Sequence, residues 1–373
     1  MLLALGEADH FWIANAVYLG FTLSGVVGAV AKIVTYRTGL RRPAGRRVPV
    51  PPAGEAMKAI VQDRFGTAAL RLSEEPDPVP GAGQVLLSVR ATGVDPGVWH
   101  LVTGLPYIVR PVAGLRGPRS RVPGRDVAGV VVAIGEGVTR FRPGDEVFGV
   151  GRGTYAERAV ARADRLEPKP AGLTFEAAAA VPTSATTALQ GLRRGDVRAG
   201  QRVLVIGAGG GIGTFAVQLA KGLGAHVTGV CGPDKVDLVR SLGADDVVDY
   251  TSAAVTGRYD VVLDTAGNRT LRQLRGLATP KGTVVIAGGE GPNRWVGSFH
   301  RNLRAPLVSP FVGQRVRSLT SVYQAADMRR LAELLASGEL VPVVSRTLPL
   351  AAAAEAIDHL ESGHTTGKQV LTV

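Results

Sequence analysis

The sequence has little cysteine and few aromatic residues. Cys231 is the single cysteine, which excludes a disulfide framework and also a zinc site built from several thiolates. Aromatic residues make up 5% of the chain and do not alternate with its basic residues. Nucleic-acid binding is therefore not predicted as a main role. The formal net charge of +12 also suits an acidic membrane or an anionic cofactor, and it does not choose between them.

The size and composition of the chain are those of a folded protein. Its 373 residues are enough for two domains with a substantial core. Hydrophobic residues make up 45% and charged residues 20% of the sequence, so disorder is not expected.

Charge is also absent from residues 11–31, a run of 21 positions that is long enough to span a bilayer. Acidic residues precede this run and several basic residues follow it, so the positive-inside rule places the rest of the chain in the cytoplasm. Three interpretations stay open: a membrane anchor, a reading frame that starts too early and whose natural start is Met57, and a hydrophobic helix outside a membrane. In each of them residues 1–56 form a hydrophobic extension that ends in a Pro- and Arg-rich linker.

A buried strand, a glycine-rich turn and a helix are predicted in succession near residue 207. Residues 203–206 form an uninterrupted apolar run, which is typical of a parallel strand buried on both faces. Five of the next seven residues are glycine. A strict G-x-G-x-x-G is absent because Ile212 occupies its sixth position, and the spacing is G-x-x-G-x-x-G instead. The order favours a dinucleotide site that binds pyrophosphate through backbone amides, over a turn that only packs a helix on a sheet. The candidate residues are Gly207, Gly210, Gly211, Ile212 and Gly213.

The end of the next predicted strand, residues 225–230, bears on the choice of cofactor. An NAD site usually places Asp or Glu there for the ribose 2′-hydroxyl, whereas this strand is followed by Cys231 and Gly232. Lys235 stands where a cation would meet a 2′-phosphate, although Asp234 lies beside it and a lysine in the first turn of a helix is often only a surface residue. The predicted cofactor is NADPH.

Short strands separated by Gly and Pro are predicted from Met57 to Pro170, as in a small barrel or sandwich. A long segment without a strand pattern connects the second and third of them, and segments of that length are often functional. Within it His100 has no partner at ligand spacing and is predicted to be structural. The Tyr107 phenol can donate to a carbonyl oxygen, or it can simply pack. The strands are predicted at 58–63, 84–92, 127–134, 146–149 and 155–160.

Strands and helices alternate in the second half of the chain, which predicts a parallel α/β sheet. Gly288 follows the last of these strands at the edge where ligands reach over a sheet. Residues 368–373 are predicted to be a strand that completes the first domain. The further strands are predicted at 244–250, 259–264 and 283–287, and the helices at 174–191, 270–277 and 328–337.

Several longer motifs carry a family resemblance. They are M-K-A-I-V at Met57, G-R-D-V-A-G-V-V at Gly124, R-F-R-P-G-D-E-V-F-G at Arg140, S-L-G-A-D-D-V-V-D-Y at Ser241 and the closing G-K-Q-V-L-T-V. With the glycine turn, they show that residues 57–373 resemble the medium-chain dehydrogenase/reductase superfamily, in its zinc-independent branch of quinone oxidoreductase-like enzymes related to zeta-crystallin. Zinc-dependent relatives have Gly-His-Glu where this chain has Gly-Arg-Asp, and the cysteine cluster is missing, so no metal site is expected.

The resemblance implies a GroES-like catalytic domain, a Rossmann domain and a cofactor between them, usually in a homodimer. The GroES-like domain would comprise residues 57–178 and the returning segment 323–373, and the Rossmann domain residues 179–322. The implied reaction is hydride transfer from NADPH to a quinone or an α,β-unsaturated carbonyl. The alternative is an NADPH-binding regulatory or membrane-tethered scaffold protein with little turnover.

The resemblance also implies roles for single residues. Lys235 matches the lysine that pairs with the 2′-phosphate, Tyr250 matches the tyrosine beside it, and Tyr107 matches a tyrosine that faces the nicotinamide and the substrate. Asp95 and Val98 depart from the Asn-x-x-Asp that is common in the family, and Asp95 is kept as a catalytic candidate because a carboxylate still accepts hydrogen bonds. Gly288 and Lys368 complete the predicted cofactor site.

Overall fold

In a computed structural model of the chain, the described residues are 56–288, 293–297, 301, 302, 305, 309, 312–363 and 365–373. The hydrophobic run 11–31 and its linker lie outside them, so the predicted anchor, the cytoplasmic location and the boundary at residue 56 stay predictions. Among the described residues, no helix combines the length and the apolar character that crossing a membrane requires.

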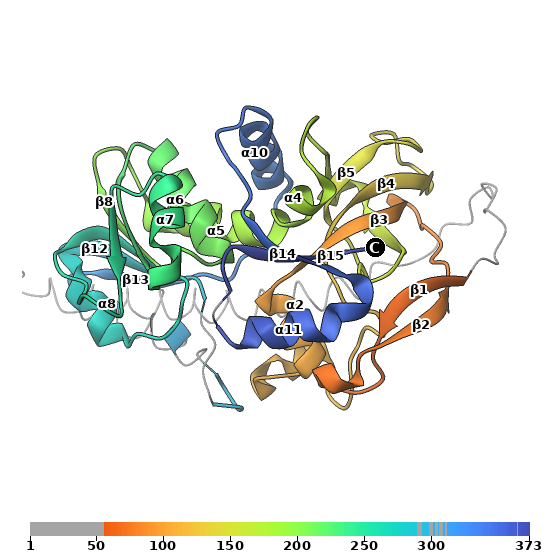
Figure 1. The fold of residues 1–373 in the computed structure, drawn as a ribbon, viewed down its shortest axis with the longest axis horizontal. Helices are drawn as coiled ribbons and strands as arrows, with labels where there is room; N and C mark the ends of the chain where they lie inside the picture. The colour runs from red at the N-terminus through yellow and green to blue at the C-terminus, as the bar shows by residue number, and fades with distance from the viewer. Residues whose placement is uncertain are drawn as a thin grey trace, which may run out of the picture. The chain divides into compact units, whose positions relative to one another are not determined.

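A seven-stranded sheet brings the C-terminal strand of the chain next to strands that lie within residues 84–168. The strand order is β14-β15-β3-β4-β5-β7, and β6 pairs with β3 beside this path. Blue β15 lies next to orange β3 in Figure 1, and the two strands pair antiparallel. The C-terminal segment therefore enters a sheet made by the first half of the chain. The strands are β3 (Gln84–Val94), β4 (Asp126–Ile134), β5 (Glu146–Val150), β6 (Arg158–Arg162), β7 (Leu166–Pro168), β14 (Val344–Pro349) and β15 (Lys368–Thr372), with β1 (Ala56–Val61) and β2 (Arg71–Pro76) as a separate pair.

The second half of the chain forms a six-stranded sheet in which every pairing is parallel. Its order is β10-β9-β8-β11-β12-β13, which is the 3-2-1-4-5-6 order of a Rossmann sheet. The order reverses between β8 and β11, and ligands of such sheets bind at that point. The predicted α/β class with a Rossmann sheet is confirmed. The strands are β8 (Arg202–Ile206), β9 (His226–Cys231), β10 (Asp246–Asp249), β11 (Tyr259–Asp264), β12 (Ala278–Ile286) and β13 (Arg315–Ser318).

Both faces of β8 are buried, as its apolar run predicts. Val203 and Val205 belong to one core cluster, whereas Leu204 and Ile206 belong to another. Helices α5 and α6 contribute to the first cluster and α8 to the second, so helices cover the sheet on both sides. The helices of the structure are α2 (Pro96–Thr103), α3 (Arg110–Ala113), α4 (Phe175–Ala179), α5 (Pro182–Gly195), α6 (Gly211–Gly222), α7 (Val236–Ser241), α8 (Leu271–Leu277), α10 (Ala325–Ala336) and α11 (Ala353–Glu361).

The sequence analysis missed one helix and placed the start of one strand too early. The segment between β3 and β4 contains helix α2, which begins with a Pro at its first turn after the N-cap Asp95 and ends at Gly104 in the left-handed region (φ 63°). An Asp-Pro pair before a helix and a Gly after it are start and stop signals. The strand predicted at 155–160 begins later, at Arg158, because Tyr155 is fully buried and its N–H donates to the Pro123 carbonyl oxygen.

Candidate functional site

The turn after β8 has a geometry that requires glycine at positions 207 and 213. Gly207 has φ +84°, and a Cβ on Gly213 would lie 2.0 Å from the Gly207 carbonyl oxygen. At Gly210, the N-cap of α6, the nearest atom to a Cβ would be 3.4 Å away. The turn thus brings the first residues of α6 close to the end of β8. The first N–H groups of a helix lack partners within the helix, so this turn suits a phosphate group.

Lys235 and Tyr250 lie at the same edge of the sheet. The Lys235 side chain passes the turn, since a Cβ on Gly209 would lie 2.7 Å from its Cδ, and its Nζ donates to the Thr365 carbonyl oxygen at 3.2 Å. The Tyr250 hydroxyl lies 3.6 Å from the position of a Cβ on Gly232, and Tyr250 is 53% exposed. The chain therefore provides a cation and an accessible aromatic ring next to the glycine turn.

Carboxylates also lie near this edge. An Asp234 oxygen is 3.0 Å from the position of a Cβ on Gly232. Burial, followed by the negative charge of Asp249, raises the pKa of the Cys231 thiol to about 11. Cys231 is thus a neutral, buried thiol at physiological pH and no nucleophile.

Gly288 follows β12 and lies against the end of β11, where a Cβ on it would be 2.6 Å from the Thr265 carbonyl oxygen. A buried ion pair fixes this contact. Arg301 donates from Nη1 to Asp264 Oδ2 at 2.7 Å and from Nη2 to the Gly288 carbonyl oxygen at 2.9 Å. The sequence analysis missed Arg301 and Asp264; the only signal was an aspartate at the end of a buried strand.

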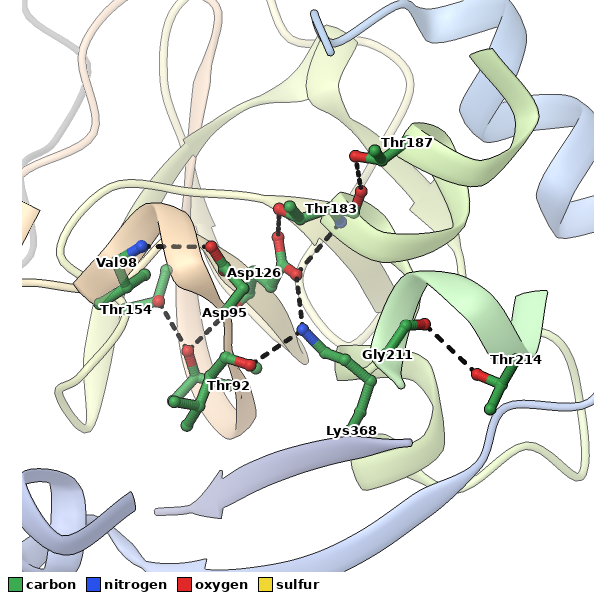
Figure 2. Close-up of polar contacts among 12 residues, drawn as sticks. Thr92, Asp95, Val98, Asp126, Thr154, Thr183, Thr187, Gly211, Thr214 and Lys368 are labelled. Atoms are coloured by element: carbon green, nitrogen blue, oxygen red, sulfur yellow. Dashed lines mark hydrogen bonds and ion pairs between the residues drawn. The ribbon is translucent and has the colours of Figure 1, made fainter. Parts of the chain in front are cut away.

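Asp126 connects strand β4 to helix α5 through hydrogen bonds. It is fully buried on β4, its Oδ1 accepts from Thr183 Oγ1 at 2.6 Å, and its Oδ2 accepts from the Thr183 N–H at 3.1 Å. Figure 2 shows these contacts with Lys368 approaching from β15. The Lys368 Nζ donates to the Val94 carbonyl oxygen at 3.0 Å and lies 4.0 Å from Asp126 Oδ2. The sequence pointed to Asp126 only as the end of the Gly-Arg-Asp that stands in place of Gly-His-Glu, and it offered no local signal for Thr183.

The electrostatics of this cluster are unbalanced, because one ammonium group faces two buried carboxylates. Burial, followed by the negative charge of Asp95, raises the pKa of Asp126 to about 6, against the opposing effects of Lys368 and Thr183. The Asp126 carboxyl therefore changes its protonation state not far below neutral pH.

Asp95 caps the N-terminus of α2 with one carboxylate oxygen, and its other oxygen is not used in the cap. It is 1% exposed, and its Oδ1 accepts from the Val98 N–H at 3.2 Å at the start of α2. Its Oδ2 has no hydrogen-bond partner among the described residues. Val98 is fully buried, so the position that departs from the family pattern packs in the core.

Tyr107 lies in a separate group of residues. Its N–H donates to the Arg294 carbonyl oxygen at 2.7 Å, and its ring meets Trp295 edge-on at 5.2 Å. The Arg110 guanidinium lies 4.6 Å from the centre of the same ring. Within the described residues no contact joins Tyr107 to Asp95 or to the glycine turn. His100 bonds through Nδ1 to the Leu105 carbonyl oxygen at 2.6 Å, and burial lowers its pKa, in keeping with a structural role.

Lys368 is adjacent to the glycine turn. A Cβ on Gly211 would lie 3.0 Å from Lys368 Cδ, and the Gly367 N–H donates to the Gly209 carbonyl oxygen at 2.8 Å. The start of β15 therefore touches the turn that precedes α6. Across the described parts of the chain, no group of three or more His, Cys, Asp or Glu residues is arranged to hold a metal ion.

Comparison with known proteins agrees with this architecture. Residues 81–171 match the alcohol dehydrogenase GroES-like domain, and residues 242–371 match the family described as zinc-binding dehydrogenase. The quinone oxidoreductase from Coxiella burnetii has a similar structure, with a TM-score of 0.75 and 28% identity over 86% of this chain and 100% of that one. The predicted GroES-like domain is confirmed.

Two relatives of known sequence cover nearly the whole of this chain. The human mitochondrial NAD(P)H oxidoreductase RTN4IP1 is 32% identical over 90% of this chain and 94% of its own length. The chloroplastic quinone-oxidoreductase QR1 of Triphysaria versicolor is also 32% identical, over 86% of this chain and 99% of its own.

Proposed function

Because the chain belongs to the medium-chain dehydrogenase/reductase superfamily, in its zinc-independent quinone oxidoreductase branch, we propose that it is an NADPH-dependent oxidoreductase that reduces a quinone or an α,β-unsaturated carbonyl. The observation that carries the proposal is the glycine turn with Lys235 beside it. The names of the relatives support the enzyme class and a nicotinamide cofactor. A homodimer is proposed from the family alone.

The residues present fit a dinucleotide. Gly207, Gly210 and Gly213 leave no side chain between the end of β8 and the start of α6, where backbone N–H groups bind a pyrophosphate. Gly211, Ile212, Gly288 and Lys368 complete the proposed cofactor site. The cofactor, when bound, supplies the hydride.

Lys235 favours the phosphorylated cofactor. In the structure its ammonium donates to the neutral carbonyl oxygen of Thr365. A 2′-phosphate is a stronger acceptor, because hydrogen bonds between two charged groups are shorter and about twice as strong. The exposed ring of Tyr250 provides a flat surface nearby. Asp234 opposes this preference, since a carboxylate repels a phosphate.

Tyr107 and Asp95 are the proposed polar groups at the substrate end. The Tyr107 hydroxyl donates to the substrate oxygen and stabilises the negative charge that develops on it. The unpaired Oδ2 of Asp95 accepts from an amide group, such as the carboxamide of a nicotinamide. Asp95 stands where the family commonly has Asn, so position 95 has no side-chain amide N–H to donate a hydrogen bond. This loss favours the second candidate function, an NADPH-binding protein with little turnover.

The test compares Lys235→Ala with Lys281→Ala, a change of an exposed lysine on β12. Lys235→Ala should lower NADPH affinity about 10- to 100-fold, the range for a hydrogen bond to a charged group, and should leave NADH affinity unchanged. Lys281→Ala should change neither. Affinities are measured by titration, and turnover is followed by NADPH absorbance with a panel of quinones and enones. Tighter binding of NADH by the wild type would contradict the NADPH assignment, and binding without turnover would favour the second candidate.

A further inference from the structure

Exposed apolar side chains collect next to Tyr107. Trp295 is 71% exposed, Leu115 72%, Val112 51% and Ile108 43%. The Ile108 N–H donates to the Trp295 carbonyl oxygen at 3.0 Å, which joins the two segments that carry these residues. Ile108 and Val112 lie four residues apart, in a 3₁₀ turn (Tyr107–Val109) and in helix α3, which follow each other directly. We call these four residues the apolar patch.

The backbone holds Leu115 in a tight, exposed turn after α3. Gly114 has φ +129°, and a Cβ on it would lie 1.9 Å from the Gly117 carbonyl oxygen. The Arg119 N–H donates to the Ala113 carbonyl oxygen at 2.7 Å, which closes the turn. Leu115 is therefore held at a defined position on the surface, and together with other exposed apolar residues it can form part of an interaction surface.

The surroundings of the patch are positively charged. The sequence has five arginines and no Asp or Glu from Pro96 to Arg125. Arg116 and Arg119 are exposed in the turn that holds Leu115, and Arg294 is exposed beside Trp295. Arg121 adds little to the positive charge around the patch, because it pairs with Asp63 and Glu75. The rim therefore suits a surface that is both apolar and anionic.

We propose that the apolar patch docks on the surface of an anionic lipid bilayer. Tryptophan prefers the membrane interface, apolar side chains enter the boundary of the acyl chains, and arginines remain at the anionic headgroups. A second copy of this chain is a poor occupant, because a two-fold contact through the patch would bring the two arginine rims together.

This inference rests on the proposed function and names a class of substrate. Tyr107, proposed to contact the substrate oxygen, packs against Trp295 of the patch. A patch seated on a bilayer places Tyr107 near the membrane surface, where quinones with long isoprenoid or alkyl tails reside. The substrates of this enzyme are therefore lipophilic quinones taken from the membrane.

The first test measures contact of the patch itself with lipid, in the full chain. The chain has three tryptophans, at positions 12, 99 and 295; Trp12→Phe removes the first, and Trp99 is buried. Vesicles with anionic headgroups and brominated acyl chains should quench the emission of Trp295. Trp295→Phe or purely zwitterionic vesicles should abolish that quenching. Vesicle binding without quenching of Trp295 would show attachment through another segment, such as residues 11–31, and would overturn the proposal.

The second test is kinetic and uses Val112→Asp/Leu115→Asp, with Leu223→Asp as the control at an exposed leucine after α6. The double variant should reduce a long-tailed quinone in anionic vesicles at least tenfold more slowly and a short, water-soluble quinone at an unchanged rate. Arg116→Gln should weaken vesicle binding about fivefold. Equal rates on the vesicle-borne quinone, or conversion of a dimer to a monomer by the double variant, would overturn docking. Failure of the wild type on every quinone would instead refute the proposed function.

Discussion

The proposed cofactor turn and the buried polar cluster near it are built from different parts of the chain. The turn is continuous, from Gly207 to Gly213, and its surface is made by the backbone. The buried polar cluster gathers side chains from the start of α2, from β4, from α5 and from β15, and its charged groups are Asp95, Asp126 and Lys368. The turn depends on the absence of side chains, and the cluster depends on the charges that side chains carry.

This difference determines which kind of mutation disrupts the glycine turn and which kind disrupts the buried polar cluster. Added side-chain atoms disturb a turn whose surface is made by the backbone, whereas a change of pH does not affect it. A buried cluster with two carboxylates and one ammonium tolerates changes of shape better than changes of charge, because an unpaired charge in the interior is costly. The following predictions separate these two modes of failure, beginning with the largest effect.

Lys368→Met removes the only cation within 4.0 Å of Asp126 in the described structure. We expect the free energy of unfolding at pH 8 to fall by about 3–5 kcal/mol, the usual loss when one partner of a buried pair is removed. Urea denaturation measures it. The added change Asp126→Asn should restore part of the loss, since it neutralises the charge left behind.

Lys169→Met is the matched control for this prediction. Lys169 is also buried, with 6% of its side chain exposed, but its partner Glu146 is 51% exposed. Glu146 stays hydrated when its partner is removed, so the loss of stability should be near 1 kcal/mol or less. Equal losses for the two lysine variants would show that buried charge is not what makes Lys368 important.

Asp126 should make the protein less stable above about pH 6 than at about pH 4. Its pKa is raised from 3.8 to about 6 in the folded state, so the folded protein binds more protons than the unfolded chain between about pH 4 and pH 6. The free energy of unfolding therefore falls as the pH rises through that window, by about 3 kcal/mol in all, and is constant above it. Asp126→Asn should abolish the decline in urea titrations. An unchanged decline in the variant would assign it to other groups.

The sequence predicted the strand, turn and helix of the proposed cofactor turn well because their signals are contiguous. The apolar run 203–206 and the glycines after it specify strand, turn and helix within a few residues, and the structure confirms these elements. The buried polar cluster joins distant residues: Asp126 and Thr183 are 57 positions apart, and Lys368 and Val94 are 274 apart. No local sequence pattern predicts a contact between residues so far apart. Asp95 illustrates the limit, since both its role as the N-cap of α2 and its unpaired oxygen appear only in the folded protein.

Gly213→Ala gives the smallest change in stability and isolates the glycine turn. The new Cβ would lie 2.0 Å from the Gly207 carbonyl oxygen, whereas a Cβ on Gly222 of the same helix meets nothing within 4 Å. Gly213→Ala should therefore destabilise the protein by about 1–3 kcal/mol through overpacking, and Gly222→Ala should stabilise it by about 0.5–1 kcal/mol. Neither effect should vary between pH 4 and pH 8. Thermal unfolding measures the stability of each variant without NADPH and the further stabilisation when NADPH is added. The stabilisation by NADPH should vanish only in Gly213→Ala. Equal stabilisation by NADPH in both variants would remove the turn after β8 from the cofactor site.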